Sequence, residues 1–251
     1  PASLSPADIS KNIYGGGTTT APDTSPAAQA APTPVPEPSA TPAALAAVKS
    51  TADPTAEVVF PDAKVEETVR LEIRKPEGRI LVADVEPLTE LGLSWQLQIS
   101  DLTGLDHLVN LTKLDLQNNQ ISDLSPIASL TNLTWLHVKY NEMVDVSPLA
   151  SLTNLSWLNL QDNQISDLSP LASLTNLSEL NIQKNQISDI SPLASLTNLT
   201  DLNLTNNQVS DLSPLASLSS LTKLNLSKNA VTDISPLLEA GFGEGLTVTL
   251  W

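Results

Sequence analysis

The sequence of 251 residues lacks cysteine and contains few aromatic residues, which make up 3% of the chain. The absence of cysteine excludes disulfide bonds, thiolate metal sites and a cysteine nucleophile. Histidine occurs only as His107 and His137, and neither a glycine-rich phosphate loop nor a catalytic Ser/His/Asp spacing is visible. No apolar run approaches the roughly 20 residues of a membrane-spanning helix. The sequence therefore predicts no enzyme, no cofactor, no metal centre and no transmembrane segment.

Positive charge is also scarce. The chain has 12 lysines and arginines against 28 aspartates and glutamates, which gives a formal net charge of −16. Nucleic acids and anionic membranes are recognised by basic surfaces, so the charge argues against both as partners. The simplest role for this general acidity is solubility.

The dominant feature that is present is a unit of 22 residues that repeats through the second half of the chain. The units begin at Leu108, Leu130, Leu152, Leu174, Leu196 and Leu218. Each carries the pattern L-x-x-L-x-L-x-x-N, with isoleucine or valine at some leucine positions. A period in the twenties with this pattern is typical of leucine-rich repeats.

The letters of one repeat indicate its structure. In the fourth unit, Leu180 and Ile182 alternate with polar residues, which predicts a short strand with one buried face. Asn185 follows where the chain must turn, and its amide is expected to bond backbone groups of the bend and of the next coil. Ser191 and Pro192 predict a short helical turn, with the serine as its cap. Such units bury their leucines only by stacking.

One aspartate also recurs in each repeat, from Asp123 to Asp233. A calcium site needs about six or more oxygen ligands that converge on one point, and a single carboxylate per coil does not supply them. We therefore expect these aspartates to bond backbone amides at the turn rather than a metal.

The repeats occupy residues 108–251, and a cap precedes them at residues 58–107. The segment 63–75 is helical in pattern, with Val65, Val69 and Ile73 facing inward and Pro76 to Gly78 as its stop. A second short helix is expected around residues 80–88, followed by a degenerate first coil with one extra residue. A polar-faced cap of this kind would cover the otherwise bare end of the stack.

The last coil is incomplete. Leu246, Val248 and Leu250 predict a final strand, but the turn asparagine of the other repeats does not follow. The sequence thus suggests a chain that continues, or was cut, beyond Trp251.

Residues 1–57 form a Pro/Ala/Thr-rich arm that holds ten of the 19 prolines. This composition buries too little apolar surface to fold alone and favours an extended stalk. Within it, residues 5–14 resemble a short helix, which is either without a role or a docking segment for a partner or a neighbouring subunit. The apolar stripe of that segment consists of Leu4, Ile9, Ile13 and Tyr14. Candidate O-glycosylation sites in the arm are Thr18, Thr19, Thr20, Thr24 and Ser25.

The repeat motif LxxLxLxxNxIxDLSPLA, together with the Phe60-Pro61-Asp62-Ala63 start of the cap helix, resembles the internalin-like leucine-rich proteins of bacterial cell surfaces. The resemblance covers residues 58–251 and implies an α/β solenoid. In that family the solenoid is a right-handed horseshoe with a parallel sheet on its concave face and a helical N-terminal cap. Members are typically secreted or surface-anchored and bind proteins or glycans without being enzymes. The sequence departs from the family in its proline-rich stalk, and neither an immunoglobulin-like domain nor an LPxTG-type sorting signal is visible in it.

Most positions that flank the strand leucines carry small polar residues, but one group does not. Trp135 and Trp157 occupy the same position in adjacent coils, so we expect them about 5 Å apart on neighbouring strands. Two interpretations are equally open: a binding hot spot, or cross-strand aromatic packing that stabilises the sheet. The candidate concave binding residues are Trp135, Trp157, His137, Lys139, Tyr140, Lys113, Gln161 and Gln183.

These observations predict an extracellular or cell-surface interaction module, adhesin-like and non-enzymatic, which binds a protein or a glycan on its concave face. The alternative is a structural subunit that decorates a surface filament, pilus or layer and is anchored through residues 1–17. A third and weaker hypothesis, an intracellular scaffold or phosphatase-type regulator, is disfavoured by the arm.

Overall fold

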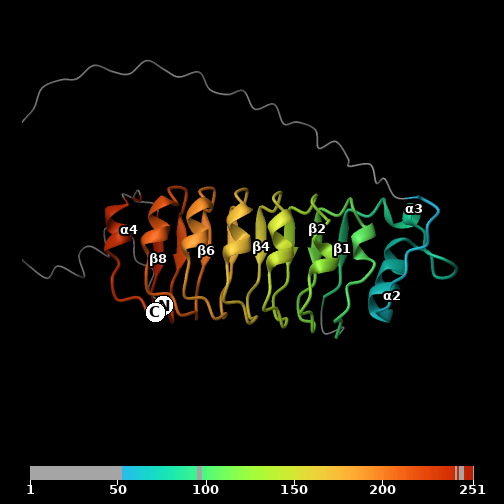
Figure 1. Ribbon diagram of the computed structural model, residues 1–251, viewed down its shortest axis with the longest axis horizontal. Coiled ribbons are helices and arrows are strands. Elements are labelled where there is room, and N and C mark those ends of the chain that lie inside the picture. Colours follow the sequence, from blue (N-terminus) through green and yellow to red (C-terminus); the bar gives the residue numbers. More distant parts are fainter. Residues whose placement is uncertain (1–52, 95–97, 241, 243–245, 251) are drawn as a thin grey trace, which may run out of the picture.

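The computed structural model describes residues 53–94, 98–240, 242 and 246–250. These residues form one row of stacked coils, with α2 and α3 at one end and α4 at the other (Figure 1). Every coil contributes one strand, and the strands form an eight-stranded parallel sheet in the sequential order β1 to β8. The predicted α/β solenoid with a parallel sheet and a helical N-terminal cap is confirmed.

The elements follow the repeat closely. The strands are β1 (Glu90–Gly92), β2 (Lys113–Asp115), β3 (Trp135–His137), β4 (Trp157–Asn159), β5 (Glu179–Asn181), β6 (Asp201–Asn203), β7 (Lys223–Asn225) and β8 (Thr247–Thr249). The α-helices are α2 (Ala63–Glu72), α3 (Val82–Val85) and α4 (Ser235–Glu239). The 3₁₀ helices on the opposite face are η1 (Leu105–His107), η2 (Ser125–Ile127), η3 (Ser147–Ser151), η4 (Ser169–Ser173), η5 (Ser191–Ser195) and η6 (Ser213–Ser217).

The sheet register places equivalent residues of successive coils side by side. Leu136 pairs with Leu158, and Leu158 pairs with Leu180, so neighbouring strands differ by 22 positions. Glu90 pairs with Lys113, a step of 23, which confirms the extra residue predicted in the first coil. Residues on one side of the strands therefore form ladders along the whole solenoid, and we call the solvent-facing side of the sheet the concave face.

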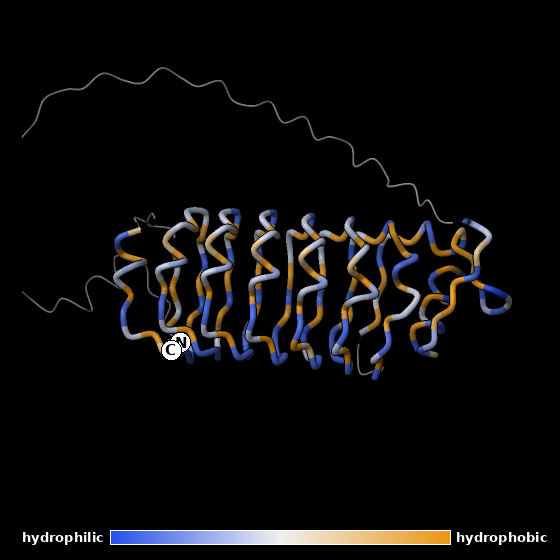
Figure 2. Tube along the Cα trace, viewed as in Figure 1, coloured by the Kyte–Doolittle hydropathy of each residue, from blue (hydrophilic) through white to orange (hydrophobic). Residues whose placement is uncertain are grey.

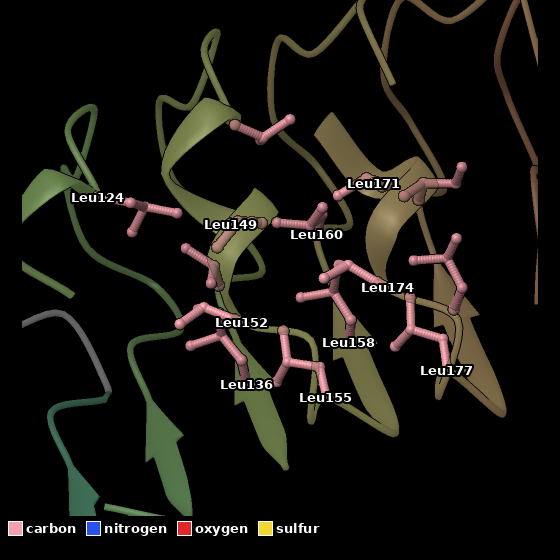
Figure 3. Packing of buried hydrophobic residues seen from close by; sticks show 14 of the residues in the cluster. Leu124, Leu136, Leu149, Leu152, Leu155, Leu158, Leu160, Leu171, Leu174 and Leu177 are labelled. Atoms are coloured by element: carbon pink, nitrogen blue, oxygen red, sulfur yellow. The ribbon is translucent and has the colours of Figure 1, made fainter. Parts of the chain in front are cut away.

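The core is a continuous aliphatic layer between the strands and the 3₁₀ helices. Leu158 in β4 and Leu171 in η4 are both buried, and with Leu174 and Leu177 they point into the same interior (Figure 3). Each coil alternates between hydrophobic and hydrophilic residues along its path (Figure 2). Because the apolar side chains of one coil are covered by the next, each coil depends on its neighbours for its stability.

The asparagine of each repeat joins its turn to the neighbouring coil, but in the opposite direction from the one expected. Asn163 Nδ2 donates to the backbone oxygen of Leu160 in its own bend (3.0 Å) and to that of Val138 in the preceding coil (3.0 Å). Its Oδ1 accepts from the backbone nitrogen of Met143, also in the preceding coil (3.0 Å). The expected bonds to the bend are confirmed, whereas the expected bond to the next coil is made to the previous one.

The aspartates, rather than the serines, cap the short helical turns. Asp189 Oδ1 accepts a hydrogen bond of 2.8 Å from the backbone nitrogen of Ser191, the first residue of η5. The same bond recurs from Asp123 to Asp233. The predicted role of the aspartates is thus confirmed, and the predicted serine cap is wrong, because the serine lies inside the turn. Pro192 occupies the second position of η5.

The N-terminal cap covers the first coil with a short amphipathic helix. Asp62 Oδ1 accepts from the backbone nitrogens of Lys64 (2.8 Å) and Val65 (3.3 Å), and so starts α2. Val65 and Val69 are fully buried, as predicted. The helix ends at Glu72, earlier than the expected stop at residues 76–78, because the backbone turns left-handed at Arg74 (φ 54°). The second helix, α3, is likewise shorter than predicted.

Residues 53–57, which the sequence places in the arm, contact the cap. Glu57 forms an antiparallel bridge with Leu81, and Ala56 packs against the core. Phe60 then lies against Gly104, whose left-handed backbone (φ 94°) has no room for a side chain. The rest of the arm lies outside the described residues.

Candidate functional site

Trp135 and Trp157 form a stacked pair on the concave face. Their positions are paired in the register of β3 and β4. The ring centroids are 4.5 Å apart and the planes differ by 9°, so the predicted proximity is confirmed. Both side chains are partly exposed, and they occupy equivalent positions on neighbouring strands of the sheet. Aromatic stacking of this kind stabilises a pair by about 0.5–1.5 kcal/mol beyond simple burial.

His137 lies two residues beyond Trp135 and supports both indoles from one side. Its ring meets those of Trp135 and Trp157 edge-on, with centroid distances of 5.5 Å and 5.4 Å. Its Nδ1 faces Asp115 Oδ1 at 3.4 Å. Burial lowers the pKa of the imidazole; Asp115 opposes this shift and Lys139 adds to it. The neutral ring is therefore favoured, and its edge contacts both indoles.

Charged side chains continue the ladder on both sides of the tryptophans. Trp157 Nε1 donates a hydrogen bond of 3.0 Å to Glu179 Oε2 on β5, which fixes the orientation of that indole. On the other side, Lys113 Nζ pairs with Glu90 Oε1 at 2.8 Å. The stacked pair is thus held between polar neighbours instead of extending into a larger apolar surface.

Lys139 and Tyr140 follow β3 in the same coil, at the turn beyond the sheet. Lys139 Nζ is 4.5 Å from the centroid of the Tyr140 ring, a cation–π distance. Tyr140 is 42% exposed and has a left-handed backbone (φ 56°), which is uncommon for an aromatic residue. Val144, which was not among the predicted residues, is 58% exposed, and the equivalent positions of adjacent repeats carry Ser122 and Ser166. The change from serine to valine at this repeat position was the signal in the sequence that could have pointed to this exposed apolar side chain.

The remaining predicted concave residues differ in accessibility. Lys113 is exposed, whereas Gln161 is only 8% exposed and offers a partner little surface. Gln161 and Gln183 instead accept hydrogen bonds from Asn181 and Asn203 in the following coils. The two glutamines therefore help to order the sheet face.

Two hollows flank the tryptophans. The larger, about 540 Å³, lies on the N-terminal side and includes Gly92 and Glu72, neither of which sequence reasoning singled out. The smaller, about 200 Å³, adjoins Trp157 and is lined mostly by polar residues of β4, β5 and β6, together with Leu158 and Leu180. The site is consequently a partly exposed aromatic ridge between two depressions.

Several predicted sites cannot be placed. The docking segment 5–14, with Leu4, Ile9, Ile13 and Tyr14, lies outside the described residues, as do the candidate glycosylation sites Thr18, Thr19, Thr20, Thr24 and Ser25. The anchoring role of residues 1–17 stays a prediction. None of the helices in the described residues has the length and hydrophobicity of a membrane span.

Comparison with protein-family models identifies leucine-rich repeats. A model of two repeat copies matches residues 88–129, 153–195 and 197–239, and a second leucine-rich repeat model matches residues 109–165. The comparison with curated proteins gives no match.

Solved structures of similar fold include two from Listeria monocytogenes. An internalin (inlF) is 38% identical with a TM-score of 0.70, and the match covers 73% of this chain and 54% of that one. Internalin C2 (inlC2) is 35% identical with a TM-score of 0.65, and the match covers 80% of this chain and all of that one. A leucine-rich repeat protein of Leptospira interrogans, 22% identical with a TM-score of 0.51, shares the fold; there the match covers 67% of this chain and 50% of that one. The chain thus spans about half the length of the first relative.

Proposed function

Because the chain belongs to the leucine-rich repeat family and is an internalin-like member of it, we propose that it is a non-enzymatic module that binds a partner protein on its concave face. We further propose that it acts outside the cell, secreted or displayed on a bacterial surface. The resemblance to internalins and the Pro/Ala/Thr-rich composition of residues 1–57 support this location.

The observation that carries the proposed binding site is the Trp135–Trp157 stack. Tryptophan is enriched among the residues that dominate binding energy, especially where polar neighbours exclude water around it. Here the indoles are partly exposed, and Glu179 and His137 hold them in place. A partner that covers them would bury apolar surface that the isolated chain leaves in water.

Rigidity is the mechanistic advantage of this arrangement. The strands are fixed by the sheet on both sides, and the turn asparagines tie each coil to its neighbour. Binding to such a surface orders few additional side chains, so little conformational entropy is lost.

Site-specific photo-crosslinking tests the proposal on the full chain. A photo-activatable residue replaces Lys113 on β2, next to Trp135 in the register, and in a control chain it replaces the exposed Ser191 in η5. Both chains are irradiated with surface and secreted proteins of the source cells. We expect a discrete protein adduct from position 113 only, and its loss when Trp135→Ala and Trp157→Ala are introduced.

Three results would contradict the proposal. Adducts that form equally at position 191 would place the interaction outside the concave face. Adducts at position 113 that survive both tryptophan substitutions would show that the indole pair is not the centre of the site. An adduct with polysaccharide instead of protein would make the partner a glycan.

A further inference from the structure

The larger hollow on the concave face lies beside the indole pair and is lined by several charged residues. It measures about 540 Å³ and lies beside the free side of Trp135, between α2 and the first two strands. Its lining residues are Glu72, Glu90, Leu91, Gly92, Lys113, Asp115 and Trp135.

Gly92 opens this hollow, although neither its backbone nor its packing requires glycine. Its φ is not left-handed, and an added Cβ would meet no atom within 4 Å. In the sheet register it is followed by Asp115, His137 and Asn159, which all carry side chains over the concave face. The effect of glycine here is therefore to leave space where the rest of the ladder is filled.

Trp135 supplies one wall of the hollow. Trp157, on the β4 side, covers one face of its indole in the parallel stack. The other face lies toward β2 and borders the hollow, which Trp157 does not line. A flat group that enters the hollow can thus stack on an indole that is already held in position.

The charge of the lining is unbalanced. Three carboxylates, those of Glu72, Glu90 and Asp115, face one cation, Lys113. Lys113 is engaged with Glu90 at 2.8 Å. Asp115 accepts hydrogen bonds from the backbone nitrogen (3.1 Å) and the side-chain nitrogen (3.2 Å) of Gln117, but these neutral donors leave its negative charge in place. Glu72 and Asp115 therefore make the hollow electronegative, and a cation between them and the indole would be attracted by the carboxylates and by the ring.

We propose that this hollow receives an arginine side chain of the protein that binds the concave face, an inference that rests on the function proposed above. A guanidinium is planar, stacks on an indole face, and presents several N–H donors to carboxylates at the same time. A lysine ammonium matches the charge but cannot stack in this way. A neutral sugar could stack on Trp135 but would leave the carboxylates uncompensated.

The test is a titration of the full, isotope-labelled chain followed by NMR. The probes are Nα-acetyl-arginine amide, the matching lysine and citrulline amides, and methyl glucoside; citrulline has the shape of arginine without its charge. We expect the arginine probe to shift the Gly92 amide and Trp135 Nε1–H signals, and to bind several-fold more tightly than each of the other three. We also expect its binding to weaken as salt is added.

Variants locate the effect. Glu72→Gln and Asp115→Asn should each weaken the arginine probe about 2- to 5-fold, as expected for partly exposed charges. Asp201→Asn, on β6 and outside the hollow, is the matched control and should change nothing. Gly92→Asn fills the hollow with the residue found at 159 and should abolish the shift of the Trp135 Nε1–H signal on addition of the arginine probe.

Equal binding of citrulline, lysine or methyl glucoside would overturn the proposal. So would an absence of shifts at Gly92 and Trp135, or arginine binding that Gly92→Asn leaves unchanged. The crosslinking experiment does not depend on this result. If the arginine probe does not bind but adducts still form at position 113, the proposed arginine site is wrong and the proposed function stands. Arginine binding without adducts instead contradicts the proposed function.

Discussion

The side-chain nitrogen of Asn185 donates a hydrogen bond of 3.0 Å to the backbone oxygen of Leu160, one coil earlier. The same side chain donates to Ile182 O (3.0 Å) and accepts from the backbone nitrogen of Ile165 (3.0 Å). Asn185 is 9% exposed, so water cannot replace these bonds. The turn of each coil is therefore completed by polar groups of two coils at once.

Replacement of this side chain should be costly. Asn185→Ala leaves a buried N–H and several carbonyls without partners, and we expect a loss of about 2–4 kcal/mol in the free energy of unfolding. Asn181→Ala, in the same coil but on the concave face, is the control and should cost less than about 1 kcal/mol. Urea denaturation measures both, and equal losses would contradict the assigned role of the turn asparagine.

The contact between cap and first coil depends on one glycine. A Cβ at Gly104 would lie 2.6 Å from the oxygen of Val59 and 2.9 Å from Phe60 Cδ1, in a left-handed backbone. Gly104→Ala should therefore destabilise the chain by about 2–4 kcal/mol. Gly92→Ala, which meets open space, should change stability by less than about 1 kcal/mol. A thermal unfolding series in which both variants behave alike would contradict this account.

Stability should depend on pH through His137. Burial lowers the pKa of this imidazole in the folded chain, whereas in the unfolded chain it titrates near its ordinary value of about 6.5. The unfolded state thus binds the proton first, so the contribution of the neutral ring is full above about 6.5 and is lost as the pH falls toward the lowered pKa. Wild type should lose more stability between about pH 7.5 and about pH 5.5 than His137→Asn, which carries the residue of position 159. Denaturation at the two pH values measures this difference. Equal losses of stability in wild type and in His137→Asn would contradict the lowered pKa.

A double-mutant cycle measures the indole stack. Trp135→Ala and Trp157→Ala, made singly and together, should give a coupling energy of about 0.5–1.5 kcal/mol in the free energy of unfolding. A second cycle between Trp157 and Lys223, three strands away, serves as control and should show no coupling beyond error. Zero coupling in the first cycle would mean that the stack does not persist in solution.

Periodicity was sufficient to predict the solenoid, because every repeat places its leucines and its turn residues at the same positions. It also predicted the Trp135–Trp157 pair, since one step of the repeat is one strand spacing in a parallel sheet. The hydrogen-bond partners of the turn asparagine were harder to predict. The repeat pattern shows that its amide needs partners, but it does not show whether the preceding or the following coil supplies them. The same limit explains the capping of η5, where Ser191 and Asp189 are both plausible caps in sequence.

The detailed geometry around Trp135 and Trp157 could not be predicted, because it depends on side-chain directions that the spacing of residues in the sequence does not determine. Gln161 occupies a concave position, yet the residues around it cover it almost entirely. His137 was expected beside the tryptophans, but its edge-on contact with both indoles depends on its rotamer. The hollow at Gly92 joins β1 to Glu72 on α2, and this proximity arises from how the cap packs on the first coil.

The central claim, that the indole pair is the centre of a protein-binding face, is tested most directly by affinity. The protein captured at position 113 is purified and titrated calorimetrically against wild type, a Trp135→Ala/Trp157→Ala variant and a control variant with Ser191→Ala and Ser213→Ala in η5 and η6. We predict that the tryptophan variant loses about 2 kcal/mol or more, about 30-fold in affinity, while the control is unchanged. A tryptophan variant that binds within about 2-fold of wild type would contradict the claim.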